Sequence, residues 1–331
     1  MFDPTRREFA TLLGSAAVAW PLAARAQQPA MPVIGFLSSA SPDGYAFFVT
    51  AFRNGLKQAG YIEGRNAAVE YRWAEGQLDR LPALAADLVG RQVAVIAADT
   101  RSTLIAKAVT TTIPIVFVSG GDPVKLGFVT SLNRPGGNIT GASFLTAAVA
   151  GKRLELLRDL IPTAAAIDYL VNPDDALGQP EIAEAEATAR THQLKLNILN
   201  VVNERGEYDF DQAFARIVKH RPDALFVAGD PVLLIRRREL VPLVNRSMIP
   251  AIYNQREYVL AGGLMSYGTS IPEHARQQGV YVGRILKGEK PGDLPVMQST
   301  RFELVINLNT AKMLGLKVPL TLQVAADEVI E

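Results

Sequence analysis

The sequence of 331 residues contains no cysteine. That absence excludes disulfide bonds, thiolate zinc sites, a cysteine nucleophile and an anchor on a lipid-modified cysteine. The chain has only three histidines, His192, His220 and His274, and their spacing fits no metal site. Lysine and arginine number 34 against 33 aspartate and glutamate residues, for a net charge of +1. A charge this close to zero gives no support for a nucleic-acid partner or a polybasic membrane surface.

Catalytic motifs are equally scarce. The sequence has no G-x-S-x-G, no P-loop and no G-x-G-x-x-G. His192 and His220 each close a predicted helix, where an imidazole stabilises the negative end of the helix dipole. Arg236–Arg238 fall on a predicted helix, point in different directions and are expected to be solvated. We therefore expect no catalytic residue, no metal site and no cofactor.

The first 26 residues have the features of an export signal. Arg6-Arg7 precede an uncharged stretch from Phe9 to Ala24, and Ala24-Arg25-Ala26 gives a small-x-small cleavage pattern. The stretch is too short to span a bilayer, which takes roughly 20 apolar residues. The paired arginines resemble a bacterial twin-arginine signal, although the general secretory route stays open. Since no later stretch approaches membrane length, we expect cleavage after Ala26 and a soluble, periplasmic protein.

The rest of the chain alternates strand and helix signals and is long enough for two domains of ordinary size. The apolar runs PVIGFLS, VAVIAA and IPIVFVS predict buried parallel strands with helices between them. A second copy of this plan runs from AIDYLVNP through ALFVAGD to IPAIYN. The pattern predicts an α/β fold of two Rossmann-like, parallel-sheet lobes.

Two further βα units follow the second copy and break the simple tandem. We therefore expect the chain to cross back between the lobes, which gives several hinge strands instead of one linker. This expectation places residues 27–142 and 256–290 in the first lobe, and 143–255 and 291–331 in the second.

Asp168 stands inside AIDYLVNP, a strand expected to be covered on both faces. An unpaired carboxylate there would be costly. Asp168 should therefore lie near the exposed start of the strand, find a hydrogen-bond donor, or have a raised pKa.

Polar loops follow several predicted strands. Each copy ends its third strand in a loop with an aspartate, AADT at Asp99 and AGDP at Asp230. Hydroxyls and free backbone N–H groups beside helix starts suit a carboxylate, and Asp230 suits an ammonium group. Tyr45, Tyr253 and Tyr267 offer aromatic walls with a polar tip. The same groups also serve as ordinary helix caps, so both interpretations stay open at each position.

Three longer motifs are SGGDPVKLGFVTSLNRPGGNITG, YNQREYVLAGGLMSYG and LKGEKPGDLPVMQSTRFELVINLNTAKMLGL. They resemble ABC transporter substrate-binding proteins of the family that includes tryptophan-binding and other aromatic-amino-acid-binding lipoproteins. The resemblance covers essentially the whole chain after residue 26. It implies a type I periplasmic binding protein that closes two lobes on a small solute and delivers it to an ABC permease in the inner membrane. We expect such a protein to act as a monomer.

The resemblance also implies which loops contact the ligand. The candidate residues are Ser38, Ser39, Asp99, Thr100, Arg101, Ser102, Gly120, Gly121, Asp122, Asp230, Asn254, Tyr267 and Gly268. If the solute is an amino acid, Asp230 is expected to hold its ammonium. Two features depart from the family pattern: Arg101 stands in a loop that tends to carry small residues, and the leader lacks the lipobox cysteine.

Three functions stay open on the sequence alone. Solute capture for uptake, with an aromatic or apolar amino acid as the first candidate, is the leading hypothesis. The alternatives are a secreted α/β enzyme working through paired carboxylates and a ligand-sensing module that docks on a membrane receptor. A cytoplasmic repressor is disfavoured, because no helix-turn-helix domain precedes the first strand.

Overall fold

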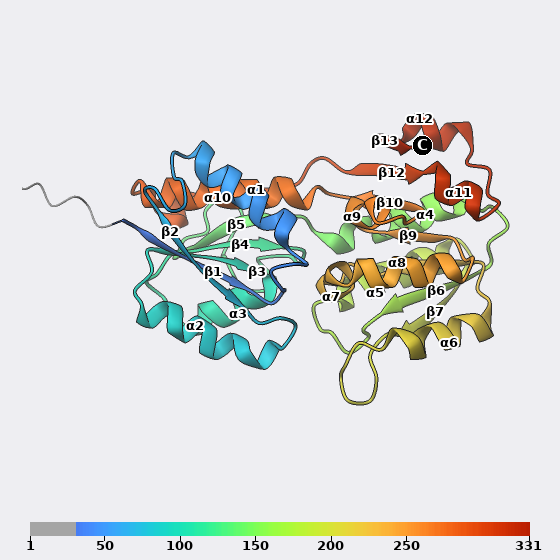
Figure 1. The fold of residues 1–331 in the computed structure, drawn as a ribbon, viewed down its shortest axis with the longest axis horizontal. Helices are drawn as coiled ribbons and strands as arrows, with labels where there is room; N and C mark the ends of the chain where they lie inside the picture. Colours follow the sequence, from blue (N-terminus) through green and yellow to red (C-terminus); the bar gives the residue numbers. More distant parts are fainter. Residues whose placement is uncertain (1–30) are drawn as a thin grey trace, which may run out of the picture.

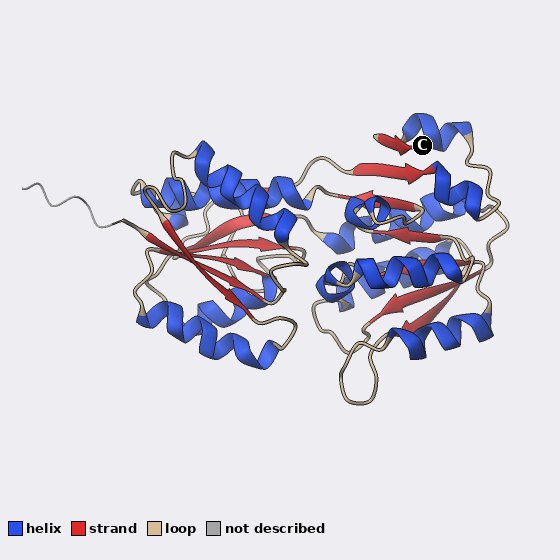
Figure 2. Cartoon of the chain, in the orientation of Figure 1, coloured by secondary structure: helices blue, strands red, loops and turns tan. Residues whose placement is uncertain are grey.

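The computed structural model describes residues 31–331, so the predicted leader and its cleavage site lie outside the described residues. Two lobes stand side by side (Figure 1), and each is a sheet with helices on both faces (Figure 2). The expected fold class, α/β with two parallel-sheet lobes joined by several crossovers, is confirmed. None of the described helices is long and apolar enough to cross a membrane.

The first lobe is built on a six-stranded sheet in the order β11-β5-β4-β3-β1-β2, and every pair is parallel. Its inner strands are continuous apolar runs, because helices cover both faces of the sheet. The strands are β1 (Val33–Ser38), β2 (Ala68–Trp73), β3 (Val95–Asp99), β4 (Ile115–Ser119), β5 (Ile139–Ser143) and β11 (Met297–Gln298). The helices are α1 (Ala46–Gln58), α2 (Leu81–Gly90), α3 (Thr100–Val109) and α10 (Ile271–Leu286).

The second lobe has a seven-stranded sheet in the order β13-β12-β10-β9-β8-β6-β7. Only β12 and β10 pair antiparallel within it. The strands are β6 (Ala166–Val171), β7 (Lys195–Asn200), β8 (Ala224–Val227), β9 (Ala251–Tyr253), β10 (Met265–Gly268), β12 (Glu303–Asn307) and β13 (Glu328–Ile330). The helices are α4 (Ala150–Leu160), α5 (Gln179–Thr191), α6 (Phe210–His220), α7 (Pro231–Ile235), α8 (Arg237–Arg246), α9 (Arg256–Leu260), α11 (Leu308–Met313) and α12 (Leu320–Ala325).

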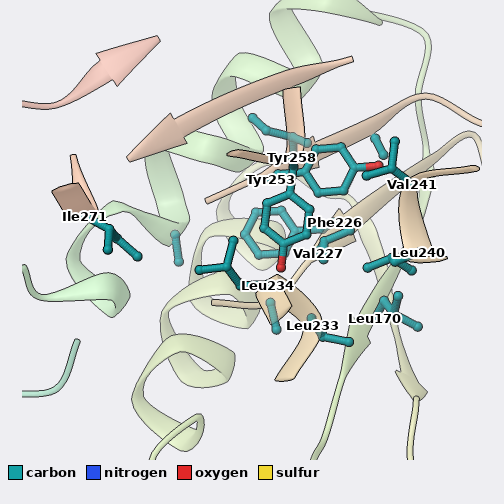
Figure 3. Close-up of a cluster of buried hydrophobic side chains, with 14 of the residues drawn as sticks. Leu170, Phe226, Val227, Leu233, Leu234, Leu240, Val241, Tyr253, Tyr258 and Ile271 are labelled. Atoms are coloured by element: carbon teal, nitrogen blue, oxygen red, sulfur yellow. The ribbon is translucent and has the colours of Figure 1, made fainter. Parts of the chain in front are cut away.

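Figure 3 shows part of the apolar core of the second lobe, where side chains of β8 meet those of α7 and α8. The rings of Tyr253 and Tyr258 stack there with their centroids 4.6 Å apart. Both tyrosines are buried, so they belong to the core of the lobe. Tyr253 is therefore not the aromatic wall of a ligand site that the sequence suggests.

The chain passes between the lobes three times, from β5 to α4, from β10 to α10 and from β11 to β12. Sheet membership differs from the division expected at residues 255/256 and 290/291. Met265–Gly268 pairs with β9 and β12 in the second sheet, whereas Met297–Gln298 pairs with β5 in the first. The expected division places the whole β10–α10 segment in the first lobe as one βα unit. Its strand stays in the second lobe, and only its helix packs on the first.

Helix α10 is held against α1 at very short range. A Cβ atom built on Gly279 would lie 2.2 Å from the carbonyl oxygen of Phe52, and one on Gly55 would lie 1.9 Å from that of Arg276. Only glycine permits such an approach of two backbones. The side-chain amide of Gln278 in α10 also donates to the backbone carbonyl oxygens of Ala98 in β3 and Val116 in β4, at 3.1 and 2.8 Å. These contacts make the late helix an integral part of the first lobe.

Asp168 lies fully buried within β6. Its Oδ1 accepts a hydrogen bond from the side-chain amide of Asn197 at 2.9 Å, and its Oδ2 lies 3.5 Å from Nδ1 of His220. The prediction that this carboxylate would find a donor is confirmed, while the alternative of an exposed strand start is wrong. His220 is the last residue of α6, as predicted, and it also faces this carboxylate.

Candidate ligand-binding site

A cavity of about 440 Å³ lies between the lobes and is called the central cavity below. Its walls include the loops that follow β1, β3, β4 and β5 of the first sheet and the loops that follow β6 and β8 of the second, together with the start of α5. Ligands of open parallel sheets bind at the carboxyl ends of the strands, and both sheets direct these ends toward the central cavity. Of the residues predicted from the sequence, it is lined by Ser39, Asp99, Thr100, Arg101, Gly120, Gly121, Asp122 and Asp230.

Asp99 organises the wall of the first lobe. Its Oδ2 accepts hydrogen bonds from the hydroxyl of Ser38 at 3.0 Å and from the backbone N–H and hydroxyl of Ser39 at 2.6 and 2.9 Å. Its Oδ1 accepts from the backbone N–H of Ser102 at 2.9 Å, which caps α3. Asp99 therefore ties the loop after β1 to the start of α3. Ser38 and Ser102 are buried behind this wall and do not line the central cavity.

The loop after β4 supplies a second part of the same wall. A Cβ atom on Gly120 would lie 2.6 Å from Oγ1 of Thr146, so this backbone touches the crossover to the second lobe. Asp122 accepts a hydrogen bond from the backbone N–H of Val124 at 2.9 Å. Gly120 thus serves close packing, and Asp122 caps its own turn while lining the cavity.

Asp230 is the corresponding carboxylate of the second lobe. It caps α7 by accepting from the backbone N–H groups of Val232 at 2.6 Å and Leu233 at 3.4 Å. Its other oxygen accepts from the hydroxyl of Tyr208, which reaches in from the loop after β7. Asp230 is only 8% exposed, and burial raises the pKa of its carboxyl group. The two interpretations of this residue are compatible, since it caps a helix and also lines the central cavity.

A buried ion pair stands behind the wall of the second lobe. Glu181 lines the central cavity and pairs with the guanidinium of Arg153, which is fully buried. Glu181 also accepts from the backbone N–H of Gly229 at 2.9 Å, and Arg153 donates to the carbonyl oxygen of Val227 at 3.0 Å. The pair therefore fixes the end of β8, which leads directly into Asp230.

Two contacts join the lobes, one across the central cavity and one between residues that do not line it. Arg101, on the first turn of α3, pairs with Asp175 in the loop after β6 at 2.5 Å. Arg237, on the first turn of α8, donates to the carbonyl oxygen of Gly44 at 3.4 Å and lies over the ring of Phe47. The expectation that all of Arg236–Arg238 are solvated is therefore wrong for Arg237, which is partly buried in this contact. It is also wrong for Arg236, which donates to the carbonyl oxygen of Tyr208 and lies over the ring of Phe210.

Apolar side chains from both lobes complete the wall. They are Tyr45, Phe48, Val118, Leu126, Phe144, Leu145, Val171, Leu177 and Ile271. The ring of Tyr45 stacks on that of Phe48 with centroids 5.2 Å apart. Burial raises the pKa of Tyr45, so its hydroxyl group stays neutral. Such a wall suits the apolar or aromatic body of a small ligand.

Besides Ser38 and Ser102, three further predicted residues do not line the central cavity. Asn254 is buried, and Gly268 packs so closely that its Cβ would lie 1.9 Å from the carbonyl oxygen of Asn254. Tyr267 stacks on Phe302 and lines a separate hollow of about 700 Å³ on the second lobe, formed with α4 and α12. Their motif thus reflects packing where β9 and β10 end. Within residues 31–331 no group of three potential ligands is placed to hold a metal ion.

The residues that hold the predicted site residues in place are not indicated by the sequence. Tyr208, Asp175 and Glu181 all serve the wall of the second lobe, and each lies in a loop or on a helix start. None stands in a motif. The one signal in the sequence is the unexpected charge of Arg101, which requires a partner when it is brought into a cavity.

Comparison with known proteins supplies the relatives of this fold. The profile of a family described as ABC transporter substrate binding protein matches residues 33–330. A tyrosine-binding protein of Clostridioides difficile is 26% identical over 270 residues, which are 80% of this chain and 76% of that protein. The crystal structure of a conserved domain protein from Vibrio cholerae matches with a TM-score of 0.82 at 26% identity, covering 90% of this chain and 99% of that one. An ABC domain in complex with L-Trp from Streptococcus pneumoniae gives a TM-score of 0.80 at 23% identity, with the same coverage.

Proposed function

The chain belongs to the ABC transporter substrate-binding protein family, and from this premise we propose that it captures an amino acid with an aromatic or apolar side chain. Capture takes place outside the cytoplasm, between the two lobes, and the solute passes to an ABC permease of the inner membrane. The family is one of binding proteins and not of enzymes. The protein acts as a monomer in this proposal.

The observation that carries the proposal is the chemistry of the central cavity. A nearly buried carboxylate, Asp230, faces a space of about 440 Å³ whose wall is largely apolar and aromatic. A buried carboxylate without a counter-ion is unfavourable, and an ammonium group on the ligand supplies the missing charge. The apolar wall then takes the ligand side chain. The tyrosine-binding relative supports an aromatic amino acid as the first candidate.

Hydrogen-bond donors for the ligand carboxylate are available on the opposite wall. Ser39, Thr100 and Gly121 line the central cavity. Thr100 begins α3, and the first N–H groups of a helix have no partner within it. These donors on the first lobe suit the carboxylate of a zwitterionic ligand, and Asp230 on the second lobe suits its ammonium group.

A thermal-shift screen of proteinogenic amino acids tests the proposal first. A ligand that binds only the folded protein raises the melting temperature, so an aromatic or apolar amino acid should produce the largest shift. Absence of any shift across the panel, confirmed by calorimetry, would contradict an amino-acid ligand.

Substitution of Asp230 tests the role of the carboxylate. Removing one partner of a desolvated charge pair costs about 2–5 kcal/mol, which is about 30-fold or more in affinity. We expect Asp230→Ala to weaken binding of the amino acid found in the screen by that factor in isothermal titration calorimetry. Asp174→Ala removes an exposed carboxylate outside the cavity and is the matched control. Unchanged affinity in Asp230→Ala would reduce Asp230 to a helix cap.

A further inference from the structure

Arg101, the second residue of α3, reaches from its own lobe to the other. Its side chain leaves the first turn of the helix, lines the central cavity and reaches Asp175 on the other lobe. The side chains of Arg101 and Asp175 are 22% and 11% exposed, so the pair is mostly withdrawn from solvent. Removing one partner of such a pair costs more free energy than removing one partner of a solvent-exposed pair.

Asp175 fixes the guanidinium but does not exhaust its donors. Only Nη2 of Arg101 donates to Asp175, and within the described part of the chain no acceptor is recorded for its Nε or Nη1. A guanidinium carries five N–H donors in a planar fork that matches a carboxylate. Asp175 is itself fixed, because its Oδ1 accepts from the backbone N–H of Leu177 at 3.1 Å. The arrangement holds a rigid cation at the cavity wall with donors to spare.

The balance of charge around the cavity makes this cation distinctive. The cavity is lined by six carboxylates and only two cations, Arg101 and Lys125, and Lys125 is exposed. Asp230 lies within electrostatic range of both Arg101 and Asp175. Beside the carboxylate that suits an ammonium group there is thus one partly buried cation, and it suits a second, negative group on the same ligand.

We propose that Arg101, positioned by Asp175, holds the α-carboxylate of the ligand, so that the pair selects amino acids against the amines that lack this group. The inference rests on the proposed function and names its specificity-determining residue. Arg101 is the contact residue, and Asp175 is a positioning residue that orients it. The competing interpretation is a latch, in which the pair only holds the two lobes together.

Calorimetry with matched probes separates these interpretations. The probes are L-tyrosine with tyramine and L-tryptophan with tryptamine, each pair differing only in the carboxylate. A charge-assisted hydrogen bond is lost in Arg101→Gln, so we expect amino-acid affinity to fall roughly 10- to 100-fold. Amine affinity should change less than about threefold, because no amine atom meets Arg101. Asp175→Asn should move the amino-acid to amine ratio in the same direction by a smaller factor.

Arg284→Gln is the matched control, since Arg284 pairs with Glu289 within the first lobe and away from the cavity. It should leave the ratio unchanged. Equal loss of amino acid and amine in Arg101→Gln would identify a latch and overturn the inference, as would no loss of either. Wild-type protein that binds none of the four probes would refute the proposed aromatic ligand and the inference with it. Wild-type binding of L-tyrosine that Arg101→Gln leaves intact would refute the inference alone.

Discussion

The ion pair between Arg153 and Glu181 holds the second lobe together behind the central cavity, and separating its charges tests how much it contributes. Arg153 is 0% exposed and Glu181 is 4% exposed. The guanidinium also lies over the ring of Phe226, 4.4 Å from its centroid. The backbone at the end of β8 bonds to both side chains. Neither charged side chain is hydrated enough to be stable in its place without the other.

Glu181→Gln removes one charge and leaves the guanidinium of Arg153 buried without a counter-ion. Breaking such a pair from one side costs about 3–5 kcal/mol. The substitution keeps the side-chain volume, so no cavity adds to this cost. At roughly 1.5–2 °C per kcal/mol for a protein of this size, the melting temperature should fall by roughly 5–10 °C. The double change Arg153→Met with Glu181→Leu should cost less than Glu181→Gln, because it leaves no charge behind.

Differential scanning calorimetry and urea unfolding of the ligand-free protein measure the effect. Glu155→Gln is the control, since Glu155 stands on the same helix as Arg153 and pairs with Lys152 at the surface. Its loss should leave the melting temperature almost unchanged. The reasoning is refuted if Glu181→Gln is no less stable than Glu155→Gln, or if the double variant is less stable than Glu181→Gln.

Three further predictions follow from contacts described above. Gly279→Ala should destabilise the protein by about 1–3 kcal/mol in urea unfolding, because its Cβ meets a backbone oxygen of α1 at 2.2 Å, whereas Gly90→Ala, with no neighbour within 4 Å, should not. Affinity for the amino acid should fall as the pH falls through the raised pKa of Asp230, which lies above its ordinary value of 3.8, since the protonated carboxyl group has no charge for an ammonium; calorimetry at a series of pH values checks this. Tyr208→Phe removes a donor that lowers the pKa of Asp230, so the loss of affinity should begin at a higher pH, and an unshifted profile would contradict this role.

The two-lobed fold was predictable because strands covered on both faces are continuous apolar runs, separated here by helical spacing. Which lobe holds each strand after β9 was not predictable. MSYG, now β10, is compatible with either sheet, and its pairing with β9 and β12 depends on tertiary packing that no local pattern encodes. The boundary predicted at 255/256 fails for this reason.

The site residues that were predictable are those whose location depends only on their position near the end of a strand. Asp99 ends β3 and Asp230 follows the equivalent strand β8, so parallel-sheet geometry brings both to the cavity. Their partners were not predictable, because Tyr208 and Asp175 stand in loops whose paths the sequence does not specify. Tyr267 was placed by analogy of motif, and its side chain turns to a different surface of the second lobe.

The three passages of the chain between the lobes also determine when each lobe can finish folding. Helix α10 covers a face of the first sheet and is synthesised after most of the second lobe, while β12 and β13 extend the second sheet only at the end. Contacts between segments so far apart in sequence form slowly, and incomplete domains with bare apolar faces aggregate. A nascent chain that stops after β9 (Ala251–Tyr253) would leave α1 without its partner helix and the second sheet without three strands. Deletion of all residues after Tyr253 should therefore prevent both lobes from folding.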